Sequence, residues 1–209
     1  MKIVPARGRC RGPGLSHSAG VSTLELVIGI ALASALAAAT ASGAFQLQSA
    51  LSVRSAAAEL AATFFRARAY ALAHGVTVGI KFRRDGGRYE WALYRDGNGN
   101  GVRTAEIASG VDRSLGLALV WARNDVRPGI LTGSAVPDPG SPGSRLDRPD
   151  DPIRFGSSDI CSFTPVGEST PGSVYLWDGR DRMAVVRIFG RSAKVRTLYY
   201  FRGERSWRR

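Results

Sequence analysis

The chain has 209 residues, of which 44% are hydrophobic and 22% are charged, and its formal net charge is +12. This composition is typical of one globular domain with an added segment, and it excludes a disordered chain and a multi-span membrane protein. The positive charge favours anionic partners such as DNA or acidic lipid headgroups.

The positive charge is concentrated at the two ends of the chain. Residues 1–20 contain four basic residues and no acid, and residues 180–209 contain ten Lys or Arg against Asp181 and Glu204. Residues 21–179 are therefore formally neutral. The distribution predicts a basic leader at one end and a basic surface at the other.

The first 45 residues are typical of a leader followed by an apolar helix. Residues 1–20 are basic and rich in Gly and Pro, whereas residues 21–45 carry Glu25 as their single charge. The apolar segment is longer than the region of about 7–15 residues in an ordinary signal peptide. A membrane span needs about 20 apolar residues, which residues 24–44 supply. A carboxylate inside such a helix costs about 2.5–3.5 kcal/mol, so Glu25 calls for a partner.

The arrangement of Gly20, Val21 and Glu25 resembles the type IV pilin and pseudopilin family. The resemblance implies that a prepilin peptidase cuts after Gly20, that Val21 is methylated, and that Glu25 pairs with the N-terminal amine of a neighbouring subunit. It also implies a single-pass inner-membrane precursor with its C-terminal domain in the periplasm, later incorporated into a pilus or pseudopilus.

Residues 46–75 are predicted to form an amphipathic helix that packs on the globular domain and ends at Gly75. Apolar residues recur there at intervals of three and four, which is the spacing of one helix face. The predicted stripe consists of Val53, Ala57, Leu60, Phe64, Ala67 and Ala71.

Residues 76–209 are predicted to form a β-rich domain. Candidate strands lie at 76–82, 89–94, 117–121, 173–177, 183–189 and 194–201, and the Pro- and Gly-rich residues 123–152 are expected to form a long mobile loop. The expected fold class is α+β: a long N-terminal helix, membrane-embedded in its first half and amphipathic in its second, packed on a C-terminal antiparallel β-sheet domain, the pilin fold.

Four further segments narrow the resemblance to the GspH/FimT minor pilin family. They are residues 58–78, including the Ala67-Arg68 pair, and residues 163–167, 172–176 and 185–191. The resemblance implies a structural subunit that primes or caps a type IV pilus or a type II secretion pseudopilus, with other pilin subunits as partners.

Residues 96–101 satisfy the first half of a calcium-loop pattern through Asp96, Asn98 and Asn100. The twelfth position of that pattern should be an acid, but it is Ile107, with Glu106 one residue early. The alternative interpretation is a polar turn between two strands, and no metal site is favoured.

The basic C-terminus is the second candidate site. In a strand, Lys194, Arg196 and Arg202 would share one face, and Val195, Thr197, Tyr199 and Phe201 the other. With Arg191 and the tail residues Arg205, Arg208 and Arg209, these cations could neutralise the phosphates of DNA. The alternative is a solvated edge, or a surface that docks an acidic partner subunit.

The sequence does not point to an enzyme or to a cofactor. His17 leaves with the leader, and His74 lies at a predicted helix end, where capping is the expected role. Cys161 would be the single thiol of the cleaved chain, since Cys10 also leaves, so a disulfide framework is excluded. The alternative to the pilin interpretation is a secreted, polyanion-binding β-domain with an ordinary signal peptide.

Overall fold

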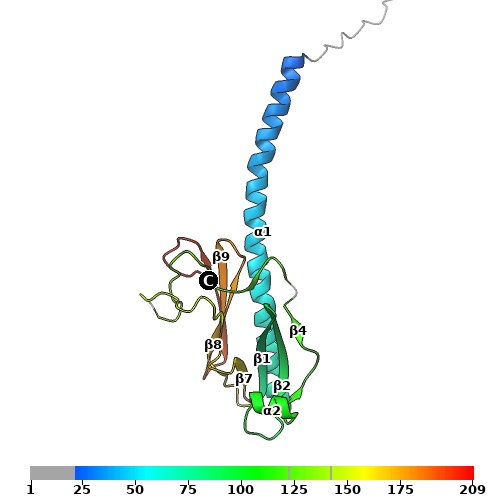
Figure 1. Cartoon of the computed structure of the whole chain (residues 1–209), viewed down its shortest axis with the longest axis vertical. Helices are drawn as coiled ribbons and strands as arrows, with labels where there is room; N and C mark the ends of the chain where they lie inside the picture. The colour runs from blue at the N-terminus through cyan, green and yellow to red at the C-terminus, as the bar shows by residue number, and fades with distance from the viewer. Residues whose placement is uncertain (1–21, 122, 142) are drawn as a thin grey trace, which may run out of the picture. The chain divides into compact units, whose positions relative to one another are not determined.

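The computed structural model describes residues 22–121, 123–141 and 143–209, and for residues 38–45 it describes the backbone alone (Figure 1). The predicted cleavage and methylation positions, Gly20 and Val21, lie outside the described residues. The chain divides into two units, residues 1–44 and residues 45–209.

The first element is α1, which runs from Thr23 to His74 and crosses the boundary between the two units. Ala and Leu dominate its sequence and have high helix propensity, and no Pro interrupts it. It ends where Gly75 adopts φ +64°, a left-handed conformation that glycine tolerates, and the Val76 amide donates to the Ala71 carbonyl (3.3 Å).

None of the helices in the described part of the chain has the length and hydropathy needed to cross a membrane. The predicted membrane-embedded half of the helix, and with it the transmembrane and single-pass inner-membrane assignments, are therefore wrong for the described residues.

Two antiparallel sheets follow α1. Sheet A has the order β3-β2-β1-β7, with β4 also pairing with β2, and sheet B has the order β10-β9-β8-β5, with β6 also pairing with β8. Sheet A consists of β1 (Val78–Asp85), β2 (Arg88–Arg95), β3 (Arg113–Ser114), β4 (Leu119–Val120) and β7 (Ile160–Phe163). Sheet B consists of β5 (Arg127–Pro128), β6 (Ile153–Arg154), β8 (Gly172–Trp177), β9 (Arg182–Phe189) and β10 (Lys194–Phe201). A short helix, α2 (Thr104–Ser109), lies between β2 and β3.

This topology corrects the expected fold class. A single β-sheet domain behind a partly membrane-embedded helix was expected, whereas the structure has two separate antiparallel sheets and no membrane-spanning helix among the described residues. The part of the chain after α1 is a β-rich, two-sheet domain.

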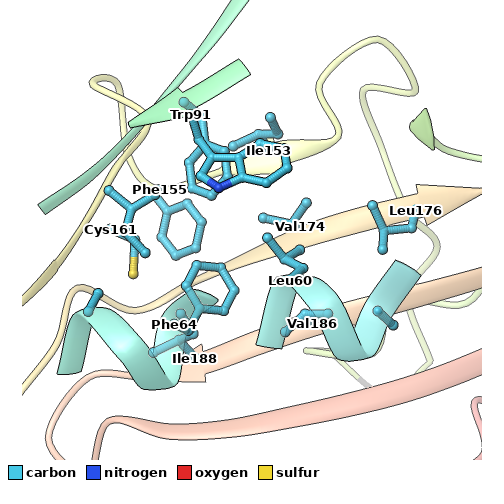
Figure 2. Packing of buried hydrophobic residues seen from close by; sticks show 14 of the residues in the cluster. Leu60, Phe64, Trp91, Ile153, Phe155, Cys161, Val174, Leu176, Val186 and Ile188 are labelled. Carbon is cyan, nitrogen blue, oxygen red and sulfur yellow. The ribbon is translucent and has the colours of Figure 1, made fainter. Parts of the chain in front are cut away.

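The main core of the second unit lies between α1 and both sheets. The stripe from Val53 to Ala71 is at most 2% exposed, and it packs against apolar residues of β1, β2, β7, β8 and β9. Phe64 is at the centre, with its ring centroid 6.1 Å from that of Phe155 and 6.4 Å from that of Phe163. Figure 2 shows Phe64 pointing from α1 towards Phe155 and Leu60 towards Val174.

A second core covers the opposite face of sheet B. Ile130, Leu131 and Val136 pack there against Tyr175 and other side chains of β8, β9 and β10. These three residues belong to the segment 123–152, which was expected to be a mobile loop. Apart from β5 the described part of the segment is irregular, but it is anchored on sheet B, because it buries apolar side chains and pairs with β8.

Candidate polyanion-binding surface

Strands β9 and β10 form a hairpin whose turn, residues 190–193, has Ala193 in a left-handed conformation (φ +44°). The register places Arg196 opposite Arg187 and Lys194 opposite Phe189. Residues opposite each other in an antiparallel pair project from the same face, so these four side chains share one end of the hairpin. We name Arg187, Phe189, Arg191, Lys194 and Arg196 the hairpin cluster.

The hairpin cluster holds four cations that gather around an aromatic strand residue at the end of the hairpin. The guanidinium carbons of Arg187 and Arg196 lie 5.6 Å and 5.3 Å from the ring centroid of Phe189, a cation–π geometry, and the ring is 38% exposed. Like charges directly opposite in a sheet are unfavourable. In the described part of the chain, no ion pair involves any of the four cations. An anion that contacts Arg187 and Arg196 would relieve this repulsion.

Two cations at the other end of β10 form ion pairs with nearby carboxylates. Arg202 Nε lies 2.5 Å from the carboxylate of Asp181, and Arg208 Nη2 lies 2.8 Å from that of Glu204. The strand β10 separates the two ends by roughly 23 Å at about 3.3 Å per residue. Among the basic residues predicted from the sequence, Arg202 and Arg208 form ion pairs, whereas Arg191, Lys194, Arg196, Arg205 and Arg209 form none within the described part of the chain.

The basic tail is folded back on the sheet. Tyr199 and Arg208 exchange two backbone hydrogen bonds of 2.8 Å each, and the Trp207 indole donates to the Pro137 carbonyl (2.7 Å). The Trp207 ring also packs on Tyr200, with the ring centroids 5.3 Å apart. Arg205 and Arg209 are exposed on this segment. The tail is thus a structural element of the second unit.

A hollow of about 180 Å³ lies between α1 and the C-terminal half of β10. The guanidinium carbon of Arg54 lies 5.5 Å from the Tyr199 ring centroid, and that of Arg182 lies 4.9 Å from the Phe201 ring centroid. Both arginines line the hollow, together with the ion pair of Arg208 and Glu204. The hollow extends the positive surface along β10.

The loop 96–101 is organised by hydrogen bonds within the chain. The Asp96 carboxylate accepts backbone N–H groups of Asn98 (3.1 Å), Gly99 (2.7 Å) and Gly101 (2.7 Å). Burial alone would raise the pKa of Asp96, but these hydrogen bonds outweigh it and lower the pKa below its ordinary value.

The side-chain amides of the two asparagines in this loop donate hydrogen bonds to the Glu106 carboxylate. The Asn98 and Asn100 amide groups lie 3.3 Å and 2.7 Å from Glu106 Oε1. The described residues include no cluster of three or more His, Cys, Asp or Glu side chains that could hold a metal. The contacts correspond to a carboxylate-centred turn that connects β2 with α2.

Glu25 lies in the first turn of α1 and is exposed, and no ion pair is found for it among residues 22–121, 123–141 and 143–209. The apolar side chains around it are also exposed: Leu24, Leu26, Val27, Ile28, Ile30, Leu32 and Leu36 have exposed fractions between 51% and 67%. This part of α1 is an uncovered apolar surface that carries one carboxylate.

His74 and Cys161 do not form a reactive pair. The exposed His74 ring stacks on Tyr70 and contacts the Tyr70 carbonyl (Nδ1 to oxygen, 3.0 Å) at the end of α1. Cys161 lies fully buried on β7, where burial raises the pKa of its thiol well above its ordinary value. The thiol therefore stays protonated at neutral pH.

Sequence reasoning missed Arg187 and Phe189 in the hairpin cluster, and Arg54 and Arg182 in the hollow. Arg187 could have been predicted from the hairpin register, because a turn of four residues, 190–193, places Arg187 opposite Arg196. Arg54 could not be found this way, because it comes from α1. Comparisons of the chain with protein-family models, with curated proteins and with solved structures found no match.

Proposed function

We propose that this protein is a structural subunit of a type IV pilus-like or type II secretion-type filament, in which it acts in priming or at the tip. The proposal rests on the resemblance of its N-terminus to pilins and on the exposed apolar side chains between Leu24 and Leu36. Large contiguous apolar surfaces on a protein usually mark an interaction site. Helices of neighbouring subunits would cover these side chains.

Glu25 would fix the axial alignment of this surface against a neighbouring subunit. A carboxylate among apolar side chains is costly to bury without a partner. The N-terminal amine of a neighbouring subunit, created by cleavage after Gly20, would supply the opposite charge. Glu25 would therefore specify which neighbour and which axial position the subunit takes.

In the same proposal, the hairpin cluster presents cations to a polyanion such as DNA. Four cations that form no ion pair, two of them beside an exposed aromatic ring, suit contact with phosphates. The prepilin peptidase and other pilin subunits are the remaining proposed partners.

The first experiment compares Glu25→Ala with Glu59→Ala, which removes a half-exposed carboxylate from the same helix. Each variant is produced in the native host, the filaments are sheared from the cells, and the subunit in the filament fraction is quantified by immunoblot. Glu25→Ala should remove the subunit from that fraction, and Glu59→Ala should leave it there. Equal recovery of both variants would contradict the proposal.

The second experiment determines the N-terminus of the protein isolated from its host by Edman sequencing and intact mass. A methylated Val21 supports the filament subunit. A chain that begins after an ordinary signal-peptide site, within the apolar segment, would instead support the alternative of a secreted polyanion-binding domain.

A further inference from the structure

The outer edge of β10 has backbone groups without a strand partner. Tyr199 exchanges its N–H and C=O bonds with Arg208, so its backbone groups point away from β9. Because the direction alternates along a strand, those of Val195 and Thr197 also point away from β9. The amide of Arg202 donates to the Asp181 carbonyl beside β9, which agrees with this alternation.

The C-terminal half of this edge is occupied and the N-terminal half is open. The tail covers Tyr199, and the Phe201 carbonyl accepts the Glu204 amide (3.0 Å). The outward backbone N–H and C=O groups of Val195 and Thr197 make no hydrogen bond within the described part of the chain. An edge of this kind is a template for another strand.

The charge around the open edge is positive. Lys194 and Arg196, both exposed, flank it, and Arg54 lies over Tyr199, where the open part ends. Arg68 approaches the other end, with its Nη1 3.5 Å from the Ala193 carbonyl and its Nε buried without a hydrogen-bond partner. In the part of the chain that the structure describes, none of these cations is paired with an acid.

We propose that the open edge of β10, at Val195 and Thr197, binds an extended acidic segment of a partner protein by strand addition. The main chain of the partner supplies both donors and acceptors, which the two N–H and two C=O groups require. DNA offers phosphate acceptors but no regular row of amide donors, so it cannot satisfy the two carbonyl groups. Acidic side chains on alternate residues of the segment would face the flanking cations.

This inference does not depend on the proposed filament function. It concerns the backbone edge, whereas polyanion binding by the hairpin cluster uses side chains alone. A substitution that blocks the edge without changing the charge therefore separates the two. Thr197→Pro removes the outward N–H and adds a ring on that side, and an outward-facing edge position is where a strand tolerates Pro.

The test uses the full chain and an acetylated, amidated peptide of alternating Glu and Val, with binding measured by isothermal titration calorimetry. The matched control variant is Thr197→Val, which keeps the N–H group and the shape of the side chain. The matched control peptide has the same sequence with N-methylated amides, so it keeps the charge and loses the strand hydrogen bonds. A short DNA duplex serves as the third ligand.

The unmodified peptide should bind wild type and Thr197→Val equally, and its affinity for Thr197→Pro should fall by about tenfold or more, a loss of about 1.4 kcal/mol. DNA affinity should not change in either variant. Equal binding of the two peptides, equal binding to Thr197→Pro and wild type, or no binding of the peptide would each overturn the proposal.

A measurement on the wild-type protein tests the proposal even if the Pro variant misfolds. Hydrogen exchange of the Val195 and Thr197 amides should slow when the peptide is added, while the Leu198 amide, which faces β9, is protected in both states. Unchanged exchange at Val195 and Thr197 under saturating peptide would also overturn the proposal.

Discussion

Replacing Arg187 and Arg196 by Gln should halve the salt dependence of DNA binding. Each phosphate that a cation neutralises contributes about −0.9 to the slope of log K against log salt concentration. If each of the four cations of the hairpin cluster contacts one phosphate, the slope is about −3.6, and the double variant retains two of them, which predicts about −1.8.

These slopes correspond to large differences in affinity. Between about 50 and 200 mM salt, wild-type affinity should fall by roughly 150-fold, and that of the double variant by roughly 12-fold. Fluorescence anisotropy with a labelled short duplex, measured at four or more salt concentrations, gives both slopes. Circular dichroism and a thermal unfolding curve verify that the variants remain folded.

The control removes an ion pair from the other end of β10. Glu204→Gln combined with Arg208→Gln leaves the net charge unchanged, because Arg208 Nη2 and the Glu204 carboxylate lie 2.8 Å apart as a pair. Its slope should remain near that of wild type. If the control loses as much slope as the Arg187 and Arg196 variant, or if that variant keeps the wild-type slope, the assignment of the hairpin cluster as the anion contact is refuted.

Two further predictions concern stability, measured by urea unfolding. Phe64→Ala should lower the free energy of unfolding by about 4 kcal/mol, because a fully buried ring is lost from the core. The control Phe65→Ala, at a side chain that is 53% exposed, should change the free energy of unfolding by about 0.5 kcal/mol or less. Similar losses in the two variants would contradict the packing of α1. Asp96→Asn should cost about 1–3 kcal/mol near pH 7. The folded-state pKa of Asp96 lies below 3.8, so the carboxylate stabilises the fold above that pH and this stabilisation is lost as the pH falls through the folded-state pKa. The difference in free energy of unfolding between wild type and variant should therefore disappear in acid. A difference that persists in acid would contradict the role of the carboxylate.

Local patterns in the sequence were enough to predict the two strands of the hairpin. The expected strands at 183–189 and 194–201 correspond to β9 (Arg182–Phe189) and β10 (Lys194–Phe201), because both are short apolar segments bounded by turn residues. The buried face of α1 followed from the spacing of its stripe in the same way.

The segment 123–152 could not be predicted from local patterns. Its buried residues, Val126, Ile130, Leu131 and Val136, lie among Pro, Gly and polar residues and show no helical period. Val126 joins the main core, and the other three are buried because they cover the outer face of sheet B, with Tyr175 and Met183. That face becomes visible only after strands distant in sequence have paired.

The same limitation explains why the basic C-terminus was treated as one surface. A net charge counts Arg187 and Arg208 equally. In the fold, however, Arg208 has a carboxylate partner and pairs through its backbone with Tyr199, whereas Arg187 lies opposite another arginine. Removal of the residues after Arg202 would uncover Tyr200 and the edge at Tyr199, because Trp207 and Arg208 pack and pair there. Such a truncation changes the fold around β10 and leaves the cations of the hairpin cluster in place. Loss of stability therefore belongs to the tail, and loss of anion binding belongs to the hairpin cluster, although both lie within the same thirty residues.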